Sequence, residues 1–186
     1  MSDHHKETFI TKYIFSQDHK MIAKQFLITG MIMAVLGMIM SAVFRVQLAN
    51  PGESSILYSL LPGSWVNEMG ALNPDKYLAL VTMHGTILVF WVLTAGLSGT
   101  FANFLIPLQI GARDMASGFL NMLSYWFFFA ATIVLISSIY VQGGPASGGW
   151  TIYPPLSALP QAIPGSGAGM TLWLVSITLF VVGSLL

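Results

Sequence analysis

The sequence contains no cysteine and few charged residues. Without cysteine, these residues cannot form disulfide bonds, iron–sulfur clusters or thiolate metal sites. Only 8% of the 186 residues are charged, whereas a soluble domain carries about a quarter, and 55% are hydrophobic. The formal net charge is zero, which gives no electrostatic basis for binding a nucleic acid. The composition therefore predicts an integral membrane protein.

Four apolar segments lie along the chain, at about residues 25–48, 77–105, 119–141 and 170–186. A membrane-spanning helix needs about 20 apolar residues, so each of the first three is long enough to cross. The second is longer than required, and we expect it to tilt or to project beyond the lipid. The fourth still runs at Leu186, where a terminal carboxylate would lie in hydrocarbon, so we expect the natural chain to continue. The sequence predicts a single all-α domain over residues 1–186, a polytopic transmembrane helix bundle.

Charges outside the apolar segments predict how the chain crosses the membrane. Residues 1–24 carry scattered charges and no compact apolar run, so they do not form a cleavable signal peptide. Lysine and arginine gather on the cytoplasmic side of membrane proteins, and lysines precede the first apolar segment, among them Lys12, Lys20 and Lys24. We therefore expect a cytoplasmic N-terminus. The loops 49–76 and 142–169 would then lie outside, and the turn 106–118 would lie inside.

Two polar side chains fall within the apolar segments at a similar depth. Arg45 is near the outer end of the first segment, and His84 follows Tyr77 by seven residues, about 10 Å along a helix. An arginine inside a span costs on the order of 3 kcal/mol, and a neutral histidine is a good iron ligand. A haem would satisfy both, and Gly85 would let a planar cofactor approach. Intramembrane histidines more often hydrogen-bond a neighbouring helix or relay protons, and position alone leaves these roles open.

The turn between the second and third segments holds another polar group of residues. Asn103 lies near the end of the second segment, Pro107 and Gly111 are expected to break that helix, and Asn121 opens the third segment. Asp114 lies between them, beside Arg113. The commoner role for such an acid is a surface charge or a helix cap. Alternatively, the two amides and the carboxylate would hold an ordered water chain that leads inward. The remaining histidines are read as structural or unassigned: His4, His5 and His19.

Five segments, in order and at matching spacing, resemble subunit I of the haem–copper oxidases. Each motif is modest alone, and the resemblance covers nearly the whole chain. Asp18–Lys20 with Ile22 is similar to the family's HK motif, and Arg45–Leu48 with Pro51-Gly52 is similar to R-x-E-L…P-G. The other three are Thr82–Gly85, which resembles the stretch around the low-spin haem ligand, Asn103–Ala116, which resembles N-W-L-V-P-L-x-I-G-A-x-D-M-A, and Gly149–Leu156, which resembles G-W-T-V-Y-P-P-L.

The resemblance implies roles for the residues around a haem. His84 would be an axial ligand of a low-spin haem iron, and Arg45 would contact the formyl group of an a-type haem. Tyr77 and Trp150 would lie near the haem propionates. The family's fold has about twelve helices, of which these residues would supply four. The full chain would also carry a high-spin haem of the a3 type and copper B, whose ligands lie outside these residues, so this stretch alone would not be catalytic.

The resemblance also implies a proton path. Asp114 would be the mouth of a proton-uptake channel, with Asn103 and Asn121 just inside it, which reverses the preference for a plain surface acid. Some positions depart from the family pattern. Gln47 stands where many members have a glutamate that helps to bind calcium or sodium, and Phe26 stands where some have a tyrosine beside the channel. The other departures are Arg113 in place of a proline, and Gly183-Ser184 in place of two serines.

The function that the resemblance implies is proton-pumping reduction of O2 to water by a cytochrome c oxidase. The expected partners are subunits II and III, membrane lipid and a cytochrome c or cytochrome-c-like electron donor, in a bacterial inner membrane. One alternative is a quinol-oxidising member of the superfamily. Such members often carry a histidine and a glutamine where this chain has Lys76 and Ala79, which favours cytochrome c. A non-catalytic haem-bearing subunit is a second alternative, and a transporter that uses Asp114 as its coupling acid is a third.

Overall fold

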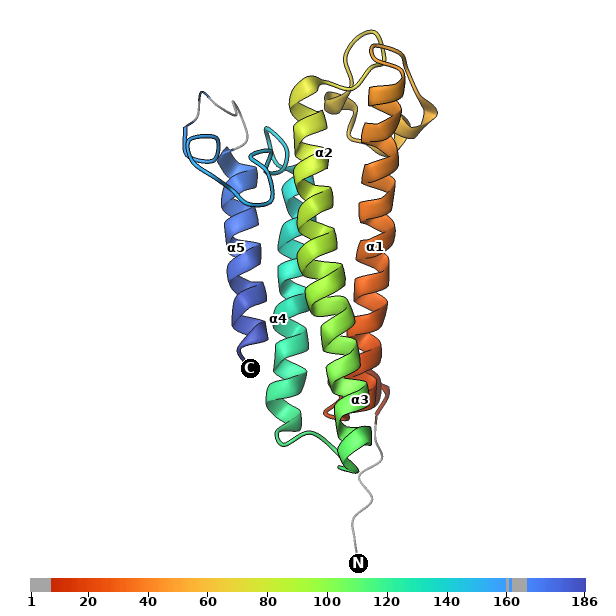
Figure 1. Cartoon of the computed structure of the whole chain (residues 1–186), viewed down its shortest axis with the longest axis vertical. Helices are drawn as coiled ribbons and strands as arrows, with labels where there is room; N and C mark the ends of the chain where they lie inside the picture. The colour runs from red at the N-terminus through yellow and green to blue at the C-terminus, as the bar shows by residue number, and fades with distance from the viewer. Residues whose placement is uncertain (1–7, 160, 162–166) are drawn as a thin grey trace, which may run out of the picture.

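The computed structural model describes residues 8–159, 161 and 167–186. Its main feature is a bundle of four long rods that run side by side, with connecting loops at both ends (Figure 1). The four spans are His19–Ala49, Pro74–Ile110, Gly118–Tyr140 and Gly167–Ser184, all long and apolar enough to cross a membrane. This arrangement confirms the predicted all-α membrane bundle. The two ends of the bundle are called the Trp150 end and the Asp114 end, after a residue in a loop at each.

The first span, helix α1 (His19–Ala49), begins at His19 rather than near residue 25. Hydropathy predicted the later start because Lys20 and Lys24 dilute the apolar run. The local cause of the earlier start is Asp18, whose carboxylate caps the helix by accepting from the Lys20 N–H at 3.1 Å. A short π-helical turn, η1 (Ile10–Ile14), precedes α1. His19, expected to lie before the membrane helix, is therefore its first residue.

The second span is one continuous rod with three parts. Helix α2 (Pro74–Thr86) starts with a proline at its first position, where the missing N–H costs nothing. It passes into the wide π-helical segment η4 (Ile87–Gly99) and then into helix α3 (Thr100–Ile110). Helix α3 ends at Gly111, whose φ of 69° is the left-handed conformation that glycine adopts at helix ends. Of the two predicted helix breakers, Gly111 is confirmed and Pro107 is wrong, since the rod continues for three residues beyond Pro107.

The remaining elements complete the bundle and its loops. Helix α4 (Gly118–Ser137) continues into a short 3-10 turn, η5 (Ser138–Tyr140), and helix α5 (Gly167–Ser184) packs along α4. At the Trp150 end, the loop between α1 and α2 contains two more 3-10 turns, η2 (Ile56–Leu60) and η3 (Gly63–Trp65). The apolar segments predicted at 119–141 and 170–186 thus correspond to α4 with η5 and to α5.

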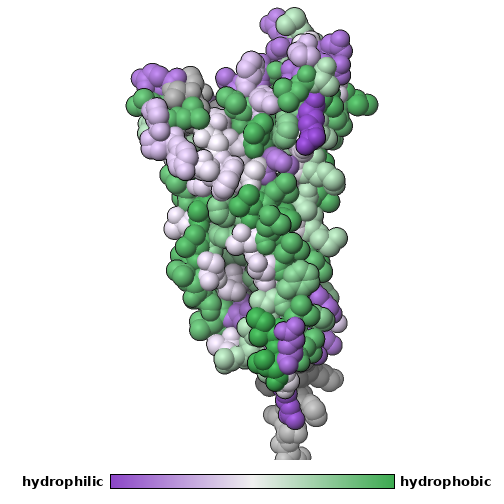
Figure 2. Space-filling model, in the orientation of Figure 1, coloured by the Kyte–Doolittle hydropathy of each residue, from purple (hydrophilic) through white to green (hydrophobic). Residues whose placement is uncertain are grey.

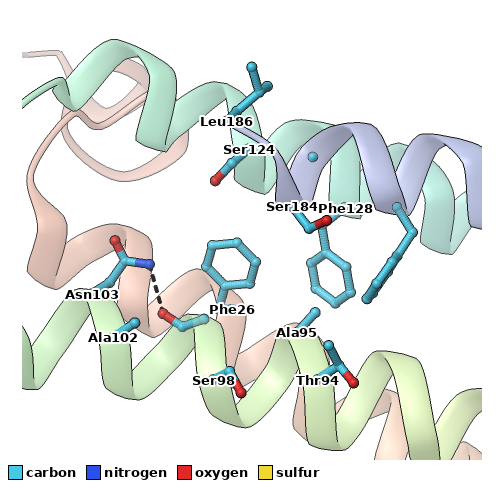
Figure 3. A pocket seen from close by; sticks show the side chains of 13 residues that line it. Phe26, Thr94, Ala95, Ser98, Ala102, Asn103, Ser124, Phe128, Ser184 and Leu186 are labelled. Atoms are coloured by element: carbon cyan, nitrogen blue, oxygen red, sulfur yellow. Dashed lines mark hydrogen bonds between the residues drawn. The ribbon is translucent and has the colours of Figure 1, made fainter.

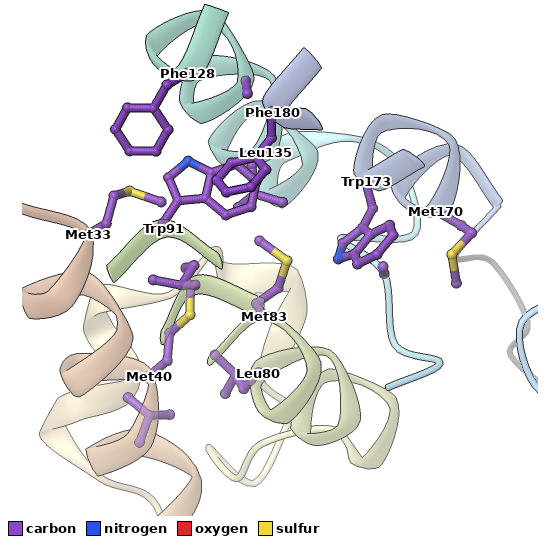
Figure 4. Close-up of a cluster of buried hydrophobic side chains, with 14 of the residues drawn as sticks. Met33, Met40, Leu80, Met83, Trp91, Phe128, Leu135, Met170, Trp173 and Phe180 are labelled. Carbon is purple, nitrogen blue, oxygen red and sulfur yellow. The ribbon is translucent and has the colours of Figure 1, made fainter. Parts of the chain in front are cut away.

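The core of the bundle is built from large aromatic and sulfur-containing side chains that meet between the helices (Figure 4). Trp91 of η4 is fully buried and donates from Nε1 to Thr132 Oγ1 of α4 at 2.8 Å. Trp173 of α5 donates in the same way to Thr86 Oγ1 of α2 at 3.0 Å. Both indoles therefore bury apolar area while their N–H groups stay paired, as burial away from water requires. These two bonds connect the second span to α4 and α5.

The outer surface of the bundle is apolar between its two ends. In Figure 2 hydrophobic residues cover the middle of the visible face, and hydrophilic residues gather toward the ends. On α1 the side chains at one face are exposed although they are large and hydrophobic, at 50–62% of full exposure: Ile28, Met31, Ile32, Val35 and Met38. A band of this kind is stable against lipid and unstable against water. Its presence agrees with the prediction of a multi-pass membrane protein.

Two glycines allow α1 and η4 to approach at backbone distance. A Cβ atom added to Gly30 would lie 2.8 Å from Gly96 Cα, which is closer than real Cβ contacts allow. Small residues at such crossings are the usual basis of close helix packing in membranes. Gly30 and Gly96 therefore fix how closely the first and second spans pack.

We expect Gly30→Ala to lower the stability of the full-length protein. Relieving the contact with Gly96 requires the two backbones to separate, at a cost of about 1–3 kcal/mol, which exceeds the gain of about 0.5–1 kcal/mol from replacing a helical glycine. The thermal midpoint in detergent should fall. Gly63→Ala is the matched control, because nothing lies within 4 Å of a Cβ at that position. An unchanged midpoint for Gly30→Ala would show that the backbones have room.

Candidate functional site

His84 lies in the last turn of α2 with its ring turned toward α1. Its Nδ1 is 2.8 Å from the main-chain carbonyl oxygen of Gly37, and the Phe44 ring lies edge-on to it, with centroids 5.4 Å apart. Because a carbonyl oxygen only accepts, Nδ1 must carry the proton. A neutral His84 therefore has its lone pair on Nε2, and the bond to Gly37 fixes the ring, as metal-binding histidines require. The side chain is suited to bind an iron ion.

Arg45 lies on the face of α1 that carries Gly37. The two are eight residues apart, a separation of about 12 Å along the helix axis, and Ser41 lies between them and accepts from Arg45 Nε at 3.2 Å. Arg45 itself is exposed. A guanidinium has five N–H donors, and this bond uses one. The bond to Ser41 thus brings the Arg45 guanidinium about one helical turn back toward the level of the His84 ring.

Tyr77 lies on the same side as His84. It is seven residues before His84, which places the two on one face of α2, and its ring packs edge-on against Phe44 with centroids 6.1 Å apart. Phe44 therefore lies against both Tyr77 and His84. The predicted roles of Arg45, Tyr77 and His84 stay predictions.

Trp150 reaches the helix at Gly85, the residue after His84. A Cβ at Gly85 would lie 3.0 Å from Trp150 Cδ1, so the indole fills the space that the glycine leaves. The loop is attached there by the Gly149 N–H, which donates to Thr82 Oγ1 at 2.9 Å. The space at Gly85 that was expected to admit a planar cofactor thus holds an indole, and a cofactor contact at Gly85 stays a prediction.

Asp114 lies at the other end, in the turn between α3 and α4. Its Oδ1 accepts from the main-chain N–H groups of Met115 at 2.8 Å and of His19 at 3.3 Å. His19 is the first residue of α1, so the carboxylate lies at a helix N-terminus, where the partial positive charge favours an anion. Asp114 is exposed, as the mouth of a path from water would be.

Asn103 is buried and Asn121 is half-buried near this end, and each has a polar atom that lacks a partner among the described residues. Asn103 Nδ2 donates to the Gly99 carbonyl at 2.7 Å. In the part of the chain that the structure describes, Asn103 Oδ1 and Asn121 Nδ2 have no hydrogen-bond partner although they are buried. Buried polar atoms are nearly always paired, with protein or with water. These atoms therefore favour bound water beside both asparagines.

A cavity of about 330 Å³ extends from Asn103 into the bundle. Figure 3 shows Asn103 at one end and the hydroxyl groups of Ser98, Thr94, Ser124 and Ser184 along it, with Phe26 and Phe128 between them. Its volume holds several water molecules, at about 30 Å³ each in the liquid. Asn103 and these four hydroxyl groups therefore give polar points to a cavity whose wall is otherwise mostly apolar. Phe26, which departs from the family pattern, supplies part of its wall and no hydroxyl.

His19 is the residue at this end that sequence reasoning missed. Its ring is 1% exposed, and its Nδ1 lies 2.8 Å from the Asn103 main-chain oxygen. Ligand atoms of Asp18, His19 and Asp114 lie within 4.8 Å of one another, so these are the residues among those described that could hold a cation. The sequence did mark His19 through the HK motif, but that motif implied no chemical role for the histidine.

Gln47 organises the loop at the Trp150 end. Its Oε1 accepts from Tyr58 OH at 2.8 Å and from the Leu72 N–H at 3.2 Å. Burial raises the pKa of the Tyr58 phenol, so the hydroxyl stays protonated and donates. This carbonyl thus performs a structural function that needs an acceptor and no charge.

We expect Gln47→Met to destabilise this loop. The change leaves two buried donors, on Tyr58 and Leu72, without an acceptor, and each costs about 1–3 kcal/mol. Proteolysis near residues 50–73 should become faster in the full-length protein. Gln47→Glu is the matched control, since its carboxylate still accepts both bonds. Equal proteolysis rates for Gln47→Met and wild type would show that these bonds contribute nothing.

Comparisons with known proteins identify relatives over most of the chain. The family model described as cytochrome c and quinol oxidase polypeptide I matches residues 21–186. The alternative cytochrome c oxidase subunit 1 of Bradyrhizobium diazoefficiens is 40% identical over 180 residues, 97% of this chain and 28% of that protein. Cytochrome c oxidase subunit 1 of Synechocystis is 35% identical over 187 residues, 100% of this chain and 29% of that protein. A haem–copper oxidase subunit I+III of Aeropyrum pernix is 34% identical, over 92% of this chain and 19% of that protein.

Proposed function

This chain belongs to the haem–copper oxidase subunit I family, and we propose that it acts within the catalytic subunit of a proton-pumping cytochrome c oxidase. The family is one of integral, multi-pass membrane proteins that contain haem and copper and take part in respiratory electron transport. The chain spans less than a third of the length of these curated relatives. The activity of the whole enzyme is therefore our proposal.

The single observation that carries the proposal is the state of His84. Its Nδ1 proton is held by the Gly37 carbonyl, which leaves Nε2 free as a ligand inside an apolar bundle. His84 would hold the low-spin haem iron, with Arg45, Tyr77 and Trp150 around the ring, and the bound haem, which we take to be haem a, would supply one-electron redox chemistry. Arg45 would provide positive charge to an oxygen of the haem edge. The ligands of the a3-type haem and copper B would lie in other parts of the subunit.

Proton uptake would use the Asp114 end. Asp114 would collect protons from water, and the unpaired Asn103 Oδ1 and Asn121 Nδ2 would orient water in the cavity beyond them. The haem site near one end and the proton mouth at the other would let electrons and protons arrive from opposite sides. Lys12 before α1 and Lys20 and Lys24 in its first turns support a cytoplasmic Asp114 end, and we propose the bacterial inner membrane as the location.

Two further features bear on partners. Lys76 stands where quinol-oxidising relatives often carry a histidine, and its ammonium group donates to the Gly143 carbonyl, which attaches the loop before Trp150 to α2. We therefore favour cytochrome c over quinol as donor. The Aeropyrum relative, named as a fusion of subunits I and III, supports assembly of this chain with a subunit III, and we propose subunit II as the second partner.

The experiment is oxygen consumption by the purified full-length complex, with reduced cytochrome c and with a ubiquinol as separate donors. Rapid oxygen uptake with cytochrome c alone is the expected result. Uptake with quinol alone would select the quinol-oxidising alternative. A complex that shows haem bands but consumes no oxygen with either donor would favour the non-catalytic haem-bearing subunit, and a complex without haem bands would favour the transporter.

A further inference from the structure

His19 connects the two groups that the proposed function places at the start of the proton path. Its main-chain N–H donates to Asp114 Oδ1 at 3.3 Å, and its ring Nδ1 lies 2.8 Å from the main-chain oxygen of Asn103. The side chain is 1% exposed, so the surrounding bundle fixes its position. One residue thus joins the first turn of α1, the Asp114 turn and helix α3.

The bond to Asn103 exists because of Pro107. In an α-helix the carbonyl of Asn103 would accept from the N–H four residues later, and that residue is Pro107, which has no N–H. A carbonyl oxygen only accepts, so His19 Nδ1 must donate the proton. The ring thereby supplies the donor that the proline removes, and helix α3 continues through Pro107.

This bond also limits what the ring can do. The Nδ1 proton is held by a backbone carbonyl, which cannot accept it and pass it on. His19 is therefore unsuited to carry protons from Asp114 to Asn103. It is suited to fix the position of Asp114 relative to Asn103, because the same residue binds the Asp114 carboxylate through its main chain and Asn103 through its ring.

The position of Asn103 relative to Asp114 matters because Asn103 lies where the cavity begins. Its Nδ2 donates to Gly99, while its Oδ1 is buried without a partner, and the residue lines the 330 Å³ cavity. If α3 shifted relative to the start of α1, the Asn103 amide would move away from the carboxylate that faces water. A water molecule that bridges two groups needs both within hydrogen-bond reach.

We propose that His19 is a positioning residue for proton uptake, which sets the spacing between the Asp114 carboxylate and the Asn103 amide through its Nδ1–H. The inference rests on the proposed role of Asp114. It assigns to His19 no proton transfer of its own and no contact with substrate.

The test uses the full-length oxidase in liposomes, with protons released per electron and turnover as readouts. The variants are His19→Ala, His19→Asn and His19→Gln. The asparagine amide nitrogen is the same number of bonds from Cα as Nδ1, so His19→Asn can still donate to the Asn103 carbonyl, while the glutamine nitrogen corresponds to Nε2. We expect His19→Ala and His19→Gln to lose proton release and to slow turnover about tenfold, since misplacement by about 1 Å can cost 10²-fold. His19→Asn should retain most of both.

The outcomes separate this inference from the proposed function and from a merely structural role. The low-spin haem band and the thermal midpoint of each variant show whether it is folded. If His19→Ala does not fold, the comparison of His19→Asn with His19→Gln decides alone. Wild-type proton release in His19→Gln, or equal loss in the asparagine and glutamine variants, would overturn the positioning role. Asp114→Asn serves as reference, because normal proton release in that variant would overturn the proposed role of Asp114 itself.

Discussion

Replacing His84 by alanine is expected to abolish the low-spin haem band of the full-length oxidase and to slow oxygen reduction by on the order of 100-fold or more. Changes in the surroundings of a metal ligand alone cost 10–100-fold, and this change removes the ligand. The measurement is a reduced-minus-oxidised optical spectrum, with oxygen uptake on the same sample. Alanine also removes the bond to the Gly37 carbonyl, so α1 and α2 lose one contact near the proposed haem.

Met83→Leu is the matched control for His84→Ala. Met83 precedes His84 and is 1% exposed, and a methionine-to-leucine change conserves volume and costs less than about 1.5 kcal/mol. Its spectrum should keep the low-spin band. If His84→Ala keeps the band as well, His84 serves only as a hydrogen-bond donor between helices, which was the commoner role from sequence position. A wild-type band of the b type would change the haem assignment and leave the ligand in place.

The sequence predicted the four spans but not their ends, for a physical reason. Hydropathy averages over many residues, whereas an end is set by one or two groups. The Asp18 carboxylate starts α1 before the apolar run does, and Pro74 is favourable as a first helical residue because that position needs no N–H. Gly111, in a left-handed conformation, ends α3, whereas Pro107, which was also expected to break the helix, lies inside it.

The residues of the candidate site also fall into those that the sequence could indicate and those that it could not. His84 and Asp114 could be selected from the sequence because each is a polar residue in or beside an apolar segment, within a motif. His19 could not, because its partner Asn103 is 84 residues away and needs a side-chain donor only because of Pro107. The π-helical winding of η4 is likewise not indicated by the amino-acid composition of that segment. Its close packing on α1 depends on Gly96 meeting Gly30, again a contact between distant residues.

Asp114→Asn is expected to remove proton pumping and to slow turnover about 10- to 100-fold, in the full-length oxidase reconstituted in liposomes. The asparagine keeps an oxygen that can accept from the His19 and Met115 N–H groups, so the turn should stay folded. It cannot bind and release a proton near neutral pH, and general acid–base groups contribute about 10²–10⁴-fold. The slower turnover would then come from the loss of proton uptake at Asp114 and not from an unfolded turn. The readouts are protons released per electron and the turnover number.

Asp18→Asn is the control that gives the Asp114 result its meaning. Asp18 is also exposed, and its ligand oxygen lies within 4.8 Å of that of Asp114, so both changes remove one negative charge from the same mouth. Asparagine still caps helices well, so α1 should keep its first turn. If proton uptake needs only local negative charge, the two variants should be impaired equally. If it needs a protonatable group held by the His19 N–H, Asp114→Asn alone should lose pumping, and that is the result we expect.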